Sequence, residues 1–453
     1  MKLADVFSSD MVFAANKPIR IFGNGQGSAT VAFAGISQTV VSDTPTWCVE
    51  FAPMEYGGPY TLAFSSDGET VTLERIYIGE VYLFAGQSNM SFSLQESNTD
   101  KALYETNDKL HYLAVSPAPS PIAWSCAMQS TVGDWSALGY LAGREIAVKK
   151  EVHVGIIVCA TGASVIESWM PAGALERIGI QLSKEDKYFD HFYEEYASWN
   201  VDGALYGDKL MRVIPLAISG VVWYQGESDA SEAEGKVYEQ ELCEMIRLWR
   251  EAFANDKLPF CIVQIADCES RIAMGPGWKL VQDAQQRISA HVPNTFTVIS
   301  RDICETDEIH PPTKDGLANR IAGVIEAHFF GCRMNDAMND SFFEQLRHYF
   351  VIIRYQYGLK DRDQEKVDNA LASIRQARNE LADCTQMQGR DILLYCIDQL
   401  FVIVAEGDAQ KVFDYTDAIH NIPELCMQKR TLRSFCRELK AFRKKYGKTY
   451  FRF

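Results

Sequence analysis

The sequence contains no long hydrophobic run. No segment of the 453 residues approaches the roughly 18 consecutive apolar residues that a membrane-spanning helix needs. The opening stretch, MKLADVFSSDMVFAANKPIRIFG, has no uninterrupted apolar segment of the kind that secretory signal peptides carry. We therefore expect a cytoplasmic protein that does not bind membranes.

An excess of positive charge is also missing. Lys and Arg total 44 against 60 Asp and Glu, which gives a net charge of -16. Nucleic acids and anionic membranes bind proteins chiefly through clustered Lys and Arg. The charge balance therefore argues against nucleic acid as the main partner.

The 12 cysteines form neither a CxxC pair nor a His/Cys ligand spacing. Many lie inside apolar runs, such as Cys159 in GIIVCA, where a free thiol behaves as a small apolar group. We expect reduced, buried thiols without a disulfide framework. We also expect no metal and no other cofactor.

The chain length predicts two or three domains, and three regions differ in composition. Residues 1–78 hold short runs, such as SATVAFAG and YTLAFSS, separated by Gly, Asn, Asp and Pro. Alternation with turn residues at this spacing is typical of a small antiparallel β-sandwich. No catalytic cluster is visible in this region.

Residues 79–334 alternate apolar strands with helical stretches. Strands without polar alternation are typical of a parallel sheet that is buried on both faces, and the order of elements predicts a doubly wound α/β domain. Ligands bind such sheets beyond the carboxyl ends of the strands. The expected strands are EVYLFAG, VHVGIIVCATG, ISGVVWYQGES, PFCIVQIAD and NTFTVISRD.

Residues 335–453 have a helical pattern. A capping-box sequence begins at Ser341, and apolar residues recur at helical spacing after it. We expect an all-α appendage of about four or five helices, which packs on itself, on the α/β domain or in a homo-oligomer contact. The apolar stripes are Phe342, Leu346, Phe350, Ile353 and Tyr357; Val367, Leu371, Ile374 and Leu381; DILLYCIDQLFVIVAEG; and Leu432, Phe435, Leu439 and Phe442.

Ser88 stands where the first expected parallel strand ends, in VYLFAGQSNM. Two interpretations compete there. Ser and Asn are favoured helix N-caps, so the segment could simply begin a helix. Alternatively, a strand that feeds a tight turn exposes a serine hydroxyl at the edge of the sheet, where a nucleophile would lie.

Two further polar clusters follow apolar segments. GVVWYQGESD ends on Gln225 and Glu227, and TDEIHPP places Asp307 and His310 three residues apart in a proline-containing loop. A serine becomes a good nucleophile when an imidazole takes its proton, and a carboxylate fixes the tautomer of that imidazole. Ser88, Asp307 and His310 can supply these three roles.

The carboxylate partner of His310 is open between Asp307 and Glu308. Residues three apart face each other in a tight turn, which favours Asp307. Residues two apart share a face in an extended loop, which favours Glu308, and Pro311 favours an extended conformation for His310.

An ester hydrolase also needs hydrogen-bond donors for the oxyanion that develops during the reaction. The candidates are the backbone N–H of Ser88, a backbone N–H at Gly162 in CATGASVIESW and the side-chain amide of Gln225. Glycine permits a close backbone approach, although an ordinary turn explains Gly162 alone equally well.

Four blocks, AGQSNM, GASVIESWM, GVVWYQGESD and EIHPPTKDGLANRIA, resemble in order and spacing those of the sialate O-acetylesterases. These enzymes are a branch of the SGNH-type hydrolases that also includes acetylesterases acting on xylan. The resemblance extends over about residues 1–330 and implies an SGNH-type α/β esterase domain at 79–334. The helices after residue 335 lie outside the common family pattern.

The resemblance implies a metal-independent serine esterase that removes O-acetyl groups from a sugar, with sialic acid as the first choice. An esterase for acetylated xylan oligosaccharides is the alternative within the same class. A non-catalytic glycan-binding protein on the same scaffold is the alternative of a different class. The complete Ser/Asp/His set argues against the last, because binding alone does not need it.

The resemblance also implies roles for single residues. Ser88 matches the nucleophile, His310 matches the base and Asp307 matches the carboxylate that orients the base. The residues expected to support the site or contact the substrate are Gln87, Asn89 and Glu227.

The oxyanion-hole positions of the family fall on Ser88, Gly162 and Gln225. The chain has TGAS where the family tends to have GGT. The backbone donor is therefore open between Gly162 and Ala163.

Overall fold

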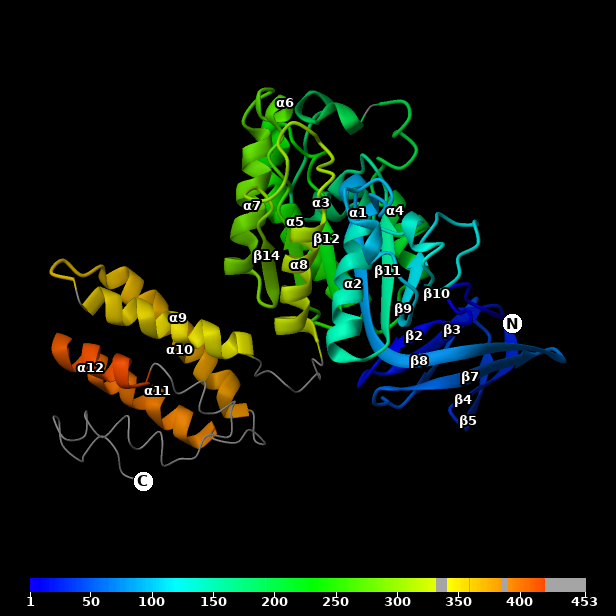
Figure 1. Cartoon of the computed structure of the whole chain (residues 1–453), viewed down its shortest axis with the longest axis horizontal. Coiled ribbons are helices and arrows are strands. Elements are labelled where there is room, and N and C mark those ends of the chain that lie inside the picture. Colours follow the sequence, from blue (N-terminus) through cyan, green and yellow to red (C-terminus); the bar gives the residue numbers. More distant parts are fainter. Residues whose placement is uncertain (192, 331–339, 358, 384–389, 420–453) are drawn as a thin grey trace. The chain divides into compact units, whose positions relative to one another are not determined.

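The computed structural model describes residues 1–191, 193–330, 340–357, 359–383 and 390–419 (Figure 1). The chain divides into two compact units, Met1–Gly331 and Cys332–Phe453. The first unit has a mixed α/β fold built around a large mixed sheet. Its strands are β1 (Lys2–Leu3), β2 (Val12–Ala14), β3 (Ile19–Asn24), β4 (Gly27–Phe33), β5 (Ile36–Ser42), β6 (Thr46–Phe51), β7 (Gly57–Ser66), β8 (Glu69–Gly86), β9 (Asn107–Ala114), β10 (Ser125–Ala127), β11 (Val154–Ala160), β12 (Gly220–Tyr224), β13 (Phe260–Val263) and β14 (Thr295–Val298).

The large sheet has the order β10-β9-β11-β8-β12-β13-β14. All neighbours along this path are parallel except β10, which runs antiparallel to β9 at the edge. Strands β11, β12 and β13 are buried almost throughout, as expected for strands covered on both faces. The five expected parallel strands are present, whereas β9 and β10 were not predicted.

The long strand β8 joins two parts of the first unit (Figure 1). Its first part pairs with β7 and β2, and its last residues lie between β11 and β12. The predicted boundary between residues 78 and 79 therefore falls inside one continuous strand. The division of the chain into three domains stays a prediction.

The N-terminal strands lie in two layers. Strands β1, β3 and β6 form a small antiparallel sheet, whereas β4, β5 and β7 extend the sheet that contains β8. The aromatic rings of Trp47 and Phe64, from β6 and β7, stack with their centroids 5.3 Å apart. That these strands form a β-sandwich domain of their own stays a prediction, because Met1–Gly331 is one compact unit.

Helices flank the parallel part of the sheet (Figure 1). Helix α2 packs on β9, β11 and α8, and α5 packs on α7, which contacts β14. Helix α5 begins at a capping box, in which Ser231 and Glu234 exchange side-chain and backbone hydrogen bonds. The helices of this unit are α1 (Ser88–Ser91), α2 (Ala137–Lys150), α3 (Ala174–Arg177), α4 (Ala204–Asp208), α5 (Glu232–Ala252), α6 (Glu269–Ile272), α7 (Gly277–His291) and α8 (Asp315–Val324).

The described part of the second unit is helical. Its helices are α9 (Asp340–Tyr357), α10 (Gln364–Asp383), α11 (Arg390–Ala405) and α12 (Ala409–Ile419). A core of its own includes the predicted Leu346, Phe350, Ile353 and Tyr357. The predicted stripe Leu432, Phe435, Leu439 and Phe442 lies outside the described residues, as do the side chains of Phe342 and Leu381. Within the described residues, no helix is long and apolar enough to cross a membrane.

Candidate active site

Three neighbouring strands end at the same edge of the sheet. Gly86, the last residue of β8, pairs with Ala160 of β11 and Tyr224 of β12. The φ angle of Gly86 is 140°, and a Cβ atom there would lie 2.0 Å from the Tyr224 carbonyl oxygen. Only glycine fits this turn, so the segments that follow all three strands meet beyond Gly86.

Ser88 is the first residue of α1, directly after this turn, and Gln87 rather than Ser88 is the N-cap. Its hydroxyl oxygen lies 2.8 Å from Nε2 of His310, which is in the loop between β14 and α8. Ser88 is partly exposed, while its neighbours Gln87 and Asn89 are buried. The structure therefore brings the predicted nucleophile and base together at the carboxyl edge of the sheet.

The surroundings of His310 favour its neutral form. Burial and the positive charge of Lys314 lower the pKa of His310. Burial also lowers the pKa of Lys314, to about 8, so below that pH its ammonium group is charged. A neutral imidazole can accept the hydroxyl proton of Ser88, which is what a general base must do.

The structure does not join Asp307 to His310 by a hydrogen bond or an ion pair within the described residues. Asp307 is exposed, and its loop contains bends without a hydrogen-bonded turn that would face residues three apart. Glu96 and Glu308 are the carboxylates whose charges act on the pKa of His310. The role of Asp307 as the orienting carboxylate stays a prediction.

Two backbone segments with candidate donors lie near Ser88. Ser88 is the first residue of α1, where N–H groups have no partner within the helix. A Cβ atom on Gly162 would lie 3.7 Å from the Ser88 Cβ, so the turn after β11 approaches the serine closely. The next residue, Ala163, has a left-handed φ of 50°. Both Gly162 and Ala163 remain candidates for the second backbone donor.

Gln225 does not direct its side-chain amide at Ser88 in this arrangement. Its Nε2 donates to the Ser164 carbonyl at 2.9 Å and to the Asp229 carboxylate, while its Oε1 accepts from Tyr238 at 2.8 Å. Both N–H groups are therefore occupied. The predicted role in the oxyanion hole would require Gln225 to exchange one of these partners for substrate, and it stays a prediction.

Asn89 connects the three segments of the site. Its Nδ2 donates to Glu227 at 2.7 Å and to the Ile309 carbonyl at 2.9 Å, and its Oδ1 accepts from Lys314 Nζ at 2.9 Å. Burial raises the pKa of Glu227 despite the hydrogen bond from Asn89. Asn89 and Glu227 thus hold the loop of His310 against the turn of Ser88, and neither touches the reacting hydroxyl.

Lys314 was not singled out from the sequence, although it lies in the block EIHPPTKDG. No local spacing could reveal its role, because His310 and Lys314 both lie in the loop before α8 and do not share a helix face. Gln87 supports the neighbouring turn. Its Oε1 accepts from the Gly226 N–H at 3.2 Å, and its Nε2 lies 3.4 Å from the Ser228 hydroxyl.

One group within the described residues has the composition to hold a metal ion. His191, Asp229 and Glu234 are buried, and one potential ligand atom from each lies within 4.8 Å of the others. Asp229 and Glu234 are close in the sequence, but His191 comes from a segment before β12, so local spacing alone could not reveal the group. No metal site was predicted from the sequence.

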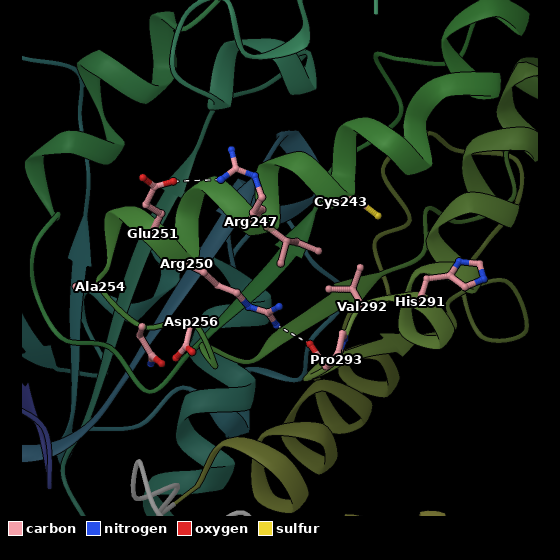
Figure 2. Close-up of a pocket in the computed structure, with 11 residues that line it drawn as sticks. Cys243, Arg247, Arg250, Glu251, Ala254, Asp256, His291, Val292 and Pro293 are labelled. Carbon is pink, nitrogen blue, oxygen red and sulfur yellow. Dashed lines mark hydrogen bonds and ion pairs between the residues drawn. The ribbon is translucent and has the colours of Figure 1, made fainter. Parts of the chain in front are cut away.

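A cavity of about 720 Å³ lies elsewhere, beside α5 and the end of α7 (Figure 2). Arg250 donates to the Pro293 carbonyl there at 2.7 Å, and Arg247 pairs with Glu251 at 3.2 Å. Its lining includes residues just before β13 and β14, at the opposite edge of the sheet from Ser88. None of the predicted site residues lines this cavity.

Comparisons with known proteins define the class of the chain as a carboxylic ester hydrolase. Residues 78–322, more than half of the chain, match the family described as carbohydrate esterase, sialic acid-specific acetylesterase. The chain belongs to this family. The predicted relationship to sialate O-acetylesterases is confirmed.

The names of similar proteins are consistent with membership of this family. Sialate O-acetylesterase from Homo sapiens is 25% identical over 368 residues, which cover 71% of this chain and 69% of that protein. The Mus musculus enzyme is 24% identical over 366 residues, which cover 66% and 68%. A carbohydrate acetylesterase structure from Xanthomonas citri matches with a TM-score of 0.65 and 26% identity, covering 73% of this chain and 76% of that one. These relatives support an esterase that acts on acetylated sugars.

Proposed function

We propose that the chain is a serine esterase that removes O-acetyl groups from sialic acid. The observation that carries this proposal is the 2.8 Å contact between Ser88 Oγ and His310 Nε2 at the carboxyl edge of the sheet. Membership of the sialic acid-specific acetylesterase family supports the choice of substrate.

In the proposed reaction, Ser88 Oγ attacks the acetyl carbonyl carbon while His310 Nε2 takes the hydroxyl proton. The negative charge on the carbonyl oxygen is held by the backbone N–H of Ser88 and that of Gly162 or Ala163. His310 then gives its proton to the departing sugar oxygen, which leaves an acetyl group on Ser88. Water attacks this acetyl-enzyme with His310 again as the base, and acetate is released.

Asp307 is proposed to orient His310, and Gln225 to contribute an amide donor when substrate is bound. The first role needs the Asp307 carboxylate to approach Nδ1 of His310. The second needs Gln225 to give up its bond to Ser164 or Asp229.

An esterase for other acetylated sugars is the second candidate, because the similar Xanthomonas citri structure is described as a carbohydrate acetylesterase. Acetate release is measured from O-acetylated sialic acid, acetylated xylan oligosaccharides and an aryl acetate. The proposal predicts the highest kcat/KM for sialic acid. A higher value for xylan oligosaccharides would select the second candidate, and no release from any ester would contradict both.

A cellular location and a role for the helical unit are also proposed. We place the protein in the cytoplasm and assign Cys332–Phe453 a packing or oligomer contact without a catalytic residue. The apolar core within its described helices supports a self-contained bundle.

A further inference from the structure

The strongest unassigned cluster surrounds His191, away from the serine nucleophile. His191 Nε2 lies 2.5 Å from Glu234 Oε1. Asp229, in the turn after β12, completes a buried group whose potential ligand atoms lie within 4.8 Å of one another. One imidazole nitrogen and two carboxylates are a common ligand set for a divalent transition metal.

Each of these side chains is held by a further contact. Glu234 Oε2 accepts from the backbone N–H of Tyr188 at 2.8 Å, which leaves Oε1 directed at His191. His191 Nδ1 lies 3.5 Å from the Glu167 carboxylate, and Glu167 is in turn paired with Lys187 at 2.8 Å. A carboxylate behind the far nitrogen is the usual way in which a metal-binding histidine is oriented.

Asp229 is anchored in the same manner. Its two carboxylate oxygens each lie 3.2 Å from the Ile166 backbone N–H, and one of them accepts from Gln225. Glu234 is thus fixed in the capping turn of α5, His191 at the end of the short helical segment Phe189–His191 before β12, and Asp229 in the turn after β12. These contacts hold the three side chains in place, and His191 and Glu234 must move apart from their direct 2.5 Å contact to admit an ion.

Glu241 provides a second, independent observation that points to a ligand at the cluster. It lies on α5 two turns after Glu234, is 3% exposed, and within the described residues its Oε2 has no hydrogen-bond partner. The Asp229, Glu234 and Glu167 carboxylates are its charged neighbours, so Glu241 lies beside the cluster. A buried carboxylate without a partner is costly unless a cation compensates it.

We propose that His191, Asp229 and Glu234 bind one divalent transition-metal ion of the zinc type, with Glu241 Oε2 as the fourth ligand or its direct neighbour. Zinc accepts four ligands of mixed nitrogen and oxygen type. Calcium prefers six to eight oxygen ligands, and magnesium usually keeps several waters. A buried cluster with one imidazole and two or three carboxylates fits zinc better than either.

The proposed ion has a structural role. It would cross-link α5 to the turn after β12, where Asp229 contacts Gln225. It takes no part in the proposed ester chemistry and does not depend on it, because Ser88 and His310 lie outside the cluster. Binding and melting temperature, rather than turnover, are therefore the measurements that test it.

The test uses the full chain without a polyhistidine tag, freed of metal by chelation and desalting. Zinc sulfate is titrated by calorimetry, with calcium chloride and magnesium chloride in parallel. We expect one zinc per chain, little binding of calcium or magnesium, and a melting temperature that zinc raises by several degrees, because the ion binds the folded state.

Two variants locate the site. Glu241→Gln removes the unpartnered charge with little change of shape, and His191→Gln removes the nitrogen ligand. We expect Kd for zinc to rise about tenfold in the first and about a hundredfold or more in the second, on the scale known for outer-shell and ligand changes. The matched control is His291→Gln, at an exposed histidine 2.7 Å from Glu239, where Kd should not change.

The absence of zinc binding by the unmodified chain would overturn the proposal. Binding that stays equally tight in Glu241→Gln and His191→Gln would also overturn it, because the zinc would then lie adventitiously on the surface. If His191→Gln fails to fold, Glu241→Gln alone decides between these outcomes. Stoichiometric calcium binding in preference to zinc would contradict the assigned class of ion.

Discussion

His310 is half-buried in a loop, and His191 is buried at the end of the short helical segment Phe189–His191. Their partners shift their pKa values in opposite directions. His310 faces a serine hydroxyl, and burial together with the charge of Lys314 lowers its pKa. Burial also lowers the pKa of His191, but the hydrogen-bonded Glu167 and Glu234 outweigh it and raise that pKa to about 9. The neighbours, rather than the residue type, decide which imidazole can act as a base near neutral pH.

The largest expected difference between the two histidines is in turnover. His310→Gln should lower kcat on an acetyl ester by about 10⁴-fold or more, because the base of the serine is lost. His191→Gln, assayed with the same ester, should stay within about tenfold if it folds, since a residue outside the reacting group acts only through structure. Circular dichroism controls for folding, and equal losses in both variants would remove the distinction.

The second prediction concerns the carboxylate that orients His310. Asp307→Asn should lower kcat by about 10²- to 10⁴-fold, because the imidazole loses the group that fixes its tautomer. Glu308→Gln is the matched control and should cost less than about tenfold. Glu308 acts on the pKa of His310 in the structure and Asp307 is not bonded to it, so the opposite ranking would assign the role to Glu308.

A smaller effect is expected at Lys314. His310 must be neutral to act as a base, so kcat/KM falls as the pH drops through the pKa of His310, which lies below its ordinary value. Lys314→Met removes a nearby positive charge and should raise that pKa, which moves the acidic limb of the profile to higher pH by about half a unit or more.

The control for this profile is Lys149→Met, which removes a charge paired with Glu145 on the outer surface of α2. Its acidic limb should coincide with that of the unmodified enzyme. An unchanged limb in Lys314→Met would mean that Lys314 does not set the protonation of His310. The melting temperature of Lys314→Met should also fall, because the hydrogen bond from Lys314 to Asn89 is lost.

The smallest effect is expected from removal of the helical unit. A chain that ends near Cys332 should retain measurable esterase activity, because Ser88, His310 and the donors around them belong to Met1–Gly331. Acetate release by the purified, folded fragment measures this. A soluble, folded and inactive fragment would show that Cys332–Phe453 completes the site.

The parts of the fold with regular local patterns could be predicted from the sequence. The last part of β8 and strands β11, β12 and β13 are buried, largely apolar runs, and α2 coincides with the predicted stretch ALGYLAGREIAVKK. Strand β9 was missed because polar residues interrupt its apolar run, and β10 because it has only three residues. The continuity of β8 could not be predicted, since the change of partners along it is a tertiary property.

In the candidate site, too, local motifs could be predicted and contacts between distant segments could not. Ser88 and His310 could be paired because each carries a recognisable local motif, and the structure brings them within 2.8 Å. The contacts of Gln225 and Lys314, and the cluster at His191, depend on side chains far apart in the sequence. Such groups become visible only when the fold places their segments together.

The most direct test of the account replaces Ser88 by alanine. Ser91→Ala is the matched control, because Ser91 is an exposed serine of the same short helix. With O-acetylated sialic acid as substrate, Ser88→Ala should release acetate about 10⁴-fold or more slowly than the unmodified chain while keeping its fold, and Ser91→Ala should be nearly unchanged. Near-normal acetate release by folded Ser88→Ala would contradict the proposed mechanism.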